Sequence, residues 1–304
     1  MNFRKYMFNS KLLAIGLAVL VLASCNGGKP KEDENNNDSI VDSDTSKTAI
    51  LNVGGELFSV PSPIQTAMLI QKSGVTYDKS ILNLSKNANT YSKDYERALN
   101  LGIYGADLGY VSMYNQTQDA IGFLAAVKQL ADKLGVSAAF DTQTMKRIEA
   151  NISNKDSMLV LVGIAYRASD AYLKNNKRNE VSGLILCGGW IESMHFSVTA
   201  YQQKASDEIK YRIAEQKQAL SSIMKLLNSL NLPETTELAK QLFQLEKVYD
   251  NITFKYTFVE PTTDSIKKMT YINSNNEVIV SKEQIEQITI IINQIRNKIT
   301  NVPS

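Results

Sequence analysis

The sequence predicts a mainly α-helical fold, a multi-helix antiparallel bundle with a small β-hairpin near its C-terminus. Two observations lead to this fold class. Apolar residues recur at intervals of three and four positions along most of the chain, which is the period of amphipathic helices. The breaks between these periodic segments are short, so consecutive helices should pack antiparallel. We expect residues 49–304 to form one helical domain, which is long enough to bury a sizeable core without disulfide bonds.

The first predicted helices have recognisable ends. A helix over about 91–114 breaks near 115–117 and is followed by a second helix over 119–134, which ends at Gly135. Asp141 is a candidate N-cap for a short helix, because its carboxylate can accept from the free backbone N–H groups of the first turn. The apolar face of this short helix consists of Met145, Ile148 and Ile152.

Two central segments, 158–166 and 181–191, are almost uninterrupted apolar runs and should be interior helices. Each is too short to span a bilayer, which takes ~20 residues. A third helix is predicted over 209–230. A fourth starts at Pro233, a residue that suits the first helical turn. The last helix covers about 282–299 and follows a capping-box pair, formed by Ser281 and Gln284.

The predicted hairpin spans about 267–280. It pairs Met269–Ile272 with Val278–Val280 across an asparagine-rich turn at 273–276, because asparagine tolerates the left-handed backbone of such turns. The preceding segment, 253–259, fits two structures. Its aromatic residues alternate with polar ones as in a strand, and its apolar residues also keep helical spacing, so both interpretations stay open.

The N-terminus has the pattern of an exported protein. Three cations, Arg4, Lys5 and Lys11, precede twelve uncharged residues, Leu12–Ala23. This length fits the apolar region of a secretory signal and falls short of a spanning helix. An ordinary signal peptide that is cut nearby would leave Cys25 as a free thiol; the other interpretation is a lipoprotein signal.

The run ends in Leu22-Ala23-Ser24-Cys25, which resembles the bacterial lipobox. The resemblance implies a signal peptide over 1–24 and a lipid on Cys25, because only a thiol forms the stable thioether. Acyl chains such as palmitate each contribute about 0.8 kcal/mol per buried methylene, so several chains together anchor a protein firmly in a membrane. Asn26 stands where aspartate would favour inner-membrane retention, and the resemblance therefore implies the outer membrane.

Residues 25–48 are polar, with six acidic residues against three lysines, and should form a flexible tether. Their acid-rich tract, 31–38, is similar to surface-export tracts of Bacteroidota lipoproteins but starts further from the cysteine, so the periplasmic and surface faces both stay open. The whole chain has a net charge of +2 and no dense basic cluster. It therefore lacks the electrostatic footprint of a nucleic-acid-binding protein.

Glycines and cysteines predict packing rather than chemistry. Gly102, Gly105 and Gly109 lie on one helical face. Their spacing differs from that of a phosphate-binding loop and no strand precedes them, so we expect another helix to pack closely there, with Gly188-Gly189 as the matching surface. Cys187, whose only possible partner is the lipidated Cys25, should be a small buried residue.

His195 is the only histidine of the chain, which restricts any site that it could form. Glu192 and His195 make one Glu-x-x-His motif, and a di-iron carboxylate site needs two. A zinc site would also lack ligands. Cys187 lies about 12 Å from His195 along one helix, and no nucleophile-elbow motif is present. We therefore predict no metal, no cofactor and no catalytic residue.

Charged residues within apolar segments are the remaining candidates for a site. Asp107 and Arg167 interrupt apolar helical faces, and a buried acid needs a partner because unpaired burial costs several kcal/mol. We predict that Asp107 or Glu192 pairs with Arg167 or His195. A structural polar network is one interpretation, and a ligand pocket between helices is the other.

Four segments resemble a family of uncharacterised, all-helical Bacteroidota lipoproteins. They are Arg97–Tyr110, Asn154–Leu159, Asp170–Asn176 and Gly188–Ser193. The resemblance implies a helical envelope lipoprotein and transfers no activity and no catalytic residue.

Two functions follow. The first is an envelope-anchored lipoprotein that acts as a non-enzymatic binding or scaffold module for a protein or small molecule and touches the membrane through its N-terminal lipid. The alternative is an envelope enzyme that uses Asp107, Arg167, Glu192 and His195 in an inter-helix cleft. Convergence of these side chains on an open cavity favours the enzyme, and interlocking in a dry core favours the module.

Overall fold

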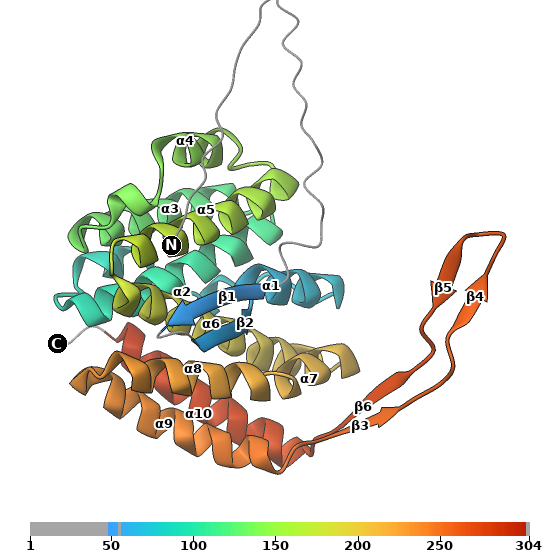
Figure 1. Ribbon diagram of the computed structural model, residues 1–304. Coiled ribbons are helices and arrows are strands. Elements are labelled where there is room, and N and C mark those ends of the chain that lie inside the picture. Colours follow the sequence, from blue (N-terminus) through green and yellow to red (C-terminus); the bar gives the residue numbers. More distant parts are fainter. Residues whose placement is uncertain (1–47, 54–55, 302–304) are drawn as a thin grey trace, which may run out of the picture. The chain divides into compact units, whose positions relative to one another are not determined.

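The structure is a computed structural model that describes residues 48–53 and 56–301, with side chains from 62 onward. The predicted signal peptide and the tether that begins at Cys25 lie outside the described residues. Within them the chain is mainly helical, with ten α-helices and a β-ribbon near the C-terminus (Figure 1), so the predicted fold class is confirmed. None of these helices is long and apolar enough to cross a bilayer.

The helices follow one another through short connections. Their bounds are α1 Pro63–Lys72, α2 Asp94–Met113, α3 Thr117–Lys133, α4 Thr142–Ala150, α5 Lys155–Asn175, α6 Asn179–Gln203, α7 Asp207–Ala214, α8 Lys217–Leu230, α9 Pro233–Asp250 and α10 Lys282–Thr300. The strands are β1 Thr48–Val53, β2 Glu56–Pro61, β3 Thr253–Thr257, β4 Thr262–Asp264, β5 Met269–Tyr271 and β6 Asn275–Ile279. Short 3₁₀ turns, η1 Lys79–Ile81, η2 Ser85–Asn89 and η3 Ser137–Ala139, complete the order of elements. The sequence patterns did not reveal the antiparallel β1–β2 pair or α1.

Several helix ends lie where local signals placed them, but the apolar runs predicted as helices over 158–166 and 181–191 are only parts of the longer helices α5 and α6. Asp141 accepts a hydrogen bond from the Thr144 N–H at 2.8 Å and so caps α4. Ser281 and Gln284 form the predicted capping box of α10. The break after α2 is made by Asn115, whose φ of 56° lies in the left-handed region that asparagine tolerates.

The single helix predicted over 209–230 is wrong, because the segment forms two helices, α7 and α8, that meet at Gln216. The buried Gln216 side chain accepts a hydrogen bond from the Trp190 indole N–H at 3.1 Å and donates to the Arg212 carbonyl at 3.2 Å. An indole N–H that is buried in the core needs an acceptor, and this requirement explains a break that the apolar periodicity does not show.

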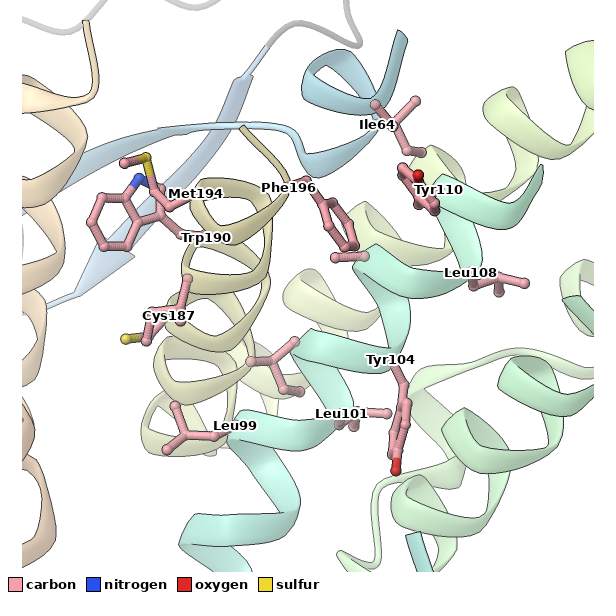
Figure 2. Packing of buried hydrophobic residues seen from close by; sticks show 14 of the residues in the cluster. Ile64, Leu99, Leu101, Tyr104, Leu108, Tyr110, Cys187, Trp190, Met194 and Phe196 are labelled. Atoms are coloured by element: carbon pink, nitrogen blue, oxygen red, sulfur yellow. The ribbon is translucent and has the colours of Figure 1, made fainter. Parts of the chain in front are cut away.

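The core is centred on α2 and α6. Where these helices cross, the predicted glycine contact is confirmed for Gly102 and Gly188: a Cβ at Gly102 would collide with the Ile185 carbonyl, and one at Gly188 would collide with the Leu99 carbonyl. The other two glycines of the predicted face lie elsewhere, Gly105 against Tyr166 of α5 and Gly109 against Ile64 of α1. Figure 2 shows the large side chains that fill the space beside this contact. The rings of Tyr110 on α2 and Phe196 on α6 pack with their centroids 4.8 Å apart.

The β-ribbon differs from the predicted hairpin in its pairing. Strand β5 pairs with β4, and β6 pairs with β3, both antiparallel. The predicted pairing of Met269–Ile272 with Val278–Val280 is therefore wrong. The chain reverses at 265–268 instead of 273–276, because Asp264 Oδ1 accepts from the N–H groups of Ile266 and Lys267 and closes the turn there. The segment with two open interpretations is a strand at Thr253–Thr257.

Candidate functional site

Three of the four candidate residues lie in one polar cluster between helices α2, α6 and α10. Asp107 comes from α2, Glu192 and His195 come from α6, and α10 supplies the residues that bind them. Arg167 is exposed on α5, and none of its described contacts joins it to the other three. The inter-helix site with four convergent side chains therefore does not form as predicted.

Glu192 is paired with Arg296 of α10, which the sequence interpretation missed. The carboxylate accepts two hydrogen bonds from the guanidinium, from Nε at 3.0 Å and from Nη2 at 2.9 Å. Glu192 is 0% exposed and Arg296 is 8% exposed. Burial lowers the pKa of Arg296, but the Glu192 carboxylate outweighs this effect and raises it. The predicted pairing of Asp107 or Glu192 with Arg167 or His195 is therefore wrong. The one available signal was that Arg296 interrupts the isoleucine stripe of the last helix.

The 3₁₀ turn η1 contributes a backbone acceptor to the cluster. The Ile81 carbonyl accepts from Arg296 Nη2 at 2.9 Å and lies 3.1 Å from His195 Nε2. The other ring nitrogen, His195 Nδ1, lies 2.8 Å from Asn293 Oδ1 on α10. Both nitrogens of His195 are thus engaged by protein groups, and the histidine binds the neighbouring helix rather than presenting a free nitrogen to a ligand.

Asp107 is the unusual member of the cluster. It is 0% exposed, and neither carboxylate oxygen has a hydrogen-bond donor among the described residues. Burial raises the pKa of Asp107 well above its ordinary value, the negative charge and hydrogen bonding of Glu192 raise it further, and Arg296 lowers it. These effects together favour the neutral, protonated form of Asp107. In that form it is a hydrogen-bond donor, and Glu192 is the carboxylate that it faces.

A second set of hydrogen bonds continues the cluster toward the end of α10. Asn83 donates to the Tyr91 hydroxyl at 3.0 Å and to Asn100 Oδ1 at 3.1 Å, and all three side chains are buried. Asn100 also donates to the Ile299 carbonyl at 3.1 Å, and Tyr91 donates to the Thr300 carbonyl at 3.3 Å. These bonds tie the segment before α2 to the last turn of α10.

The cluster interlocks and does not surround a cavity. Asp107 and Glu192 have no accessible surface, so a water-sized group cannot touch either carboxyl. An apolar cavity of about 40 Å³ does exist elsewhere, between α2 and α5. It is far smaller than the pockets of several hundred Å³ that bind small molecules. Its lining includes Leu101, Leu108, Leu124, Met145, Ile148 and Val162.

Residues that could bind a metal are scattered. In the described ranges no three His, Cys, Asp or Glu residues are grouped so that they could hold an ion. Cys187 is a free, fully buried cysteine, and burial raises the pKa of its thiol, so the group is an unreactive part of the core.

The comparisons with known proteins add no relative: no family model matches the sequence, and neither a curated protein nor a solved structure is a significant match. The resemblance to Bacteroidota lipoproteins therefore stays a prediction from the sequence. The conclusion that the geometry supports is a limited one: the chain is a mainly helical protein whose sequence-predicted site residues, Arg167 excepted, form a closed, buried polar cluster.

Proposed function

We propose that this protein is an envelope-anchored lipoprotein whose helical domain serves as a non-enzymatic binding or scaffold module. The anchor is the lipid on Cys25, and the outer membrane is its location. The single observation that supports the non-enzymatic role is the closure of the polar cluster, in which Glu192 and Asp107 have no accessible surface. The binding partner is a protein or a small molecule, and no feature of the described residues favours nucleic acid.

The physical argument concerns access. A catalytic acid or base must come within hydrogen-bond reach of the atom that it protonates or deprotonates. Asp107 has the raised pKa that is typical of such groups, but a substrate would have to separate α2, α6 and α10 to touch it. The alternative is an enzyme with a cleft lined by Asp107, Arg167, Glu192 and His195. It is less well supported, because Arg167 is exposed on α5 and has no described contact with the other three.

The anchor is tested by metabolic labelling of cells with an alkynyl fatty acid, followed by click detection on the purified chain. We expect label on the native chain and none on Cys25→Ala, because the thioether needs the sulfur atom. Cys187→Ala is the matched control: its thiol is buried, so this variant should keep the label. A native chain that carries no acyl group and is recovered without membranes contradicts the proposal.

A further inference from the structure

The β-ribbon at residues 253–280, hereafter the arm, exposes apolar side chains throughout its length. It leaves the bundle after α9 and returns at α10 (Figure 1). Its exposed large apolar residues are Phe254, Tyr256, Phe258, Val259, Ile266, Met269, Tyr271, Ile272 and Ile279. A two-stranded ribbon has no core of its own and is marginally stable in water. Contiguous exposed apolar surface of this kind marks a site of interaction.

The tip of the arm is a turn that is closed by hydrogen bonds and that leaves one apolar side chain exposed to solvent. Asp264 Oδ1 accepts from the N–H groups of Ile266 and Lys267, both at 3.0 Å, and Asp264 is paired across the ribbon with Met269. These bonds hold the backbone of residues 265–268. As a result the Ile266 side chain is 95% exposed, the largest value among the exposed apolar residues.

Two cations, Lys267 and Lys268, follow this isoleucine. Lys268 has a φ of 53°, in the left-handed region, which glycine or asparagine adopts more easily than lysine. The sequence nevertheless has a lysine there, next to Lys267. Over residues 262–272 the two lysines face one acid, Asp264, which lies 3.8 Å from Lys267 and whose other oxygen closes the turn. Nearer the bundle the charge has the opposite sign, because Lys255 lies directly opposite Glu277 and Glu260 adds a second acid.

We propose that the tip of the arm inserts into the headgroup region of a bilayer that contains anionic phospholipids. Ile266, with Met269 and Ile272 behind it, enters the apolar boundary, and the ammonium groups of Lys267 and Lys268 contact lipid phosphates. Tyr271 suits the interface, where tyrosine rings concentrate. The charge of the tip argues for lipid over the tip of a second copy of this chain, because two such tips, each with Lys267 and Lys268 against one acid, would repel each other.

This contact complements the proposed lipid anchor but does not depend on it, so it is tested in a chain that cannot be acylated. The chain carries Cys25→Ala and Ile266→Cys, with an environment-sensitive fluorophore on the new thiol at position 266; buried Cys187 does not react. The probes are phosphatidylcholine vesicles with and without phosphatidylglycerol. We expect a blue shift, and quenching by brominated acyl chains, in the vesicles with phosphatidylglycerol.

The matched control places the same fluorophore at an exposed position of α4, through Lys146→Cys in the Cys25→Ala chain. Its emission should not change, even where the apolar N-terminal segment brings the whole chain to the vesicle. Lys267→Gln and Lys268→Asn should each weaken the vesicle affinity, measured with the fluorophore at position 266, by about fivefold. Asparagine keeps the left-handed turn, so the second variant changes charge without changing the backbone.

Three outcomes overturn the inference. They are an unchanged emission from the fluorophore at position 266, equal emission shifts at positions 266 and 146, and a vesicle affinity that stays the same in Lys267→Gln and Lys268→Asn. A fourth is a shift without vesicles that grows with protein concentration, which would assign the arm to a second copy of the chain. None of these results bears on acylation, and a missing acyl group on the native chain would leave the insertion of the tip untouched.

Discussion

The polar cluster and the arm place their side chains in opposite environments. Glu192, Asp107 and Arg296 are charged or polar groups in the interior of the bundle, whereas Ile266 and Ile272 are large apolar groups in water. In the cluster, Asp107 has the only buried side-chain oxygens without a hydrogen-bond partner among the described residues, and burial raises its pKa, which favours the neutral form and lowers the cost of burying it. In the arm, Phe254 near the base contacts the Tyr211 ring of α7, with ring centroids 6.2 Å apart, whereas Ile266 and Ile272 are 95% and 82% exposed.

The residues of the cluster find most of their partners within the chain, whereas the outer apolar residues of the arm need a partner outside it. A buried ion pair is weak evidence for stability, because desolvation offsets the attraction of the charges, but removing one partner leaves a costly unpaired charge. The Glu192–Arg296 pair therefore requires α6 and α10 to pack in one register. The arm imposes no such requirement on the bundle, so its sequence is free to serve an external contact.

The largest expected effect comes from breaking the pair on one side. Arg296→Met leaves Glu192 buried without its cation and should lower the free energy of unfolding by about 3–5 kcal/mol. Urea unfolding followed by circular dichroism measures the loss. Adding Glu192→Leu to Arg296→Met removes the orphaned charge and should restore most of the stability. A single variant that loses less than about 1 kcal/mol would mean that solvent reaches Glu192 and that the cluster is not closed.

The charge state of Asp107 predicts a pH dependence of intermediate size. Its pKa is raised in the folded protein, so the folded state binds more protons than the unfolded chain above the ordinary value of 3.8. The contribution is full below that value and is lost as pH rises toward the folded pKa, at up to about 1.4 kcal/mol per pH unit. Asp107→Asn mimics the protonated acid and should remove this slope.

The measurement compares urea unfolding of the native chain and of Asp107→Asn between about pH 4 and neutral pH. Other groups with shifted pKa values, such as Asp119 and Glu215, are the same in both proteins, so the difference between the two curves isolates Asp107. Parallel curves would show that Asp107 is ionised in the folded state and has a donor.

The smallest effect should come from shortening the arm. Replacing residues 258–274 by Asn-Gly joins Thr257 to Asn275, which already face each other in the β3–β6 register, through a two-residue turn that suits a hairpin. Thermal and urea unfolding of the bundle should change by no more than about 0.5 kcal/mol. A large loss would show that the arm supports the bundle, and its apolar side chains would then need another explanation.

Local patterns in the sequence predicted much of the helical fold and only part of the cluster. The isoleucine period and the Ser281–Gln284 box predicted α10 closely, because helix signals involve residues three or four positions apart. The same period failed at Gln216, where a single hydrogen bond to Trp190 ends one helix and starts another. Asp107 or Glu192 was predicted to pair with Arg167 or His195, but the partners of Glu192 and His195 lie on α10 and in the η1 turn.

The sequence by itself determined the helical class, the approximate limits of α2, α3, α4 and α10 and the lipobox pattern around Cys25, all of which depend on neighbouring residues. The small residues at Gly102 and Gly188 also indicated where α2 and α6 meet. Only the tertiary structure decided that Arg296 pairs with Glu192 across 104 positions, that β3 pairs with β6, and that burial raises the pKa of Asp107. These choices depend on which groups meet when helices pack, and on the water that packing removes. Neither the contacts nor the loss of water can be read from the sequence, because both arise only when the chain folds.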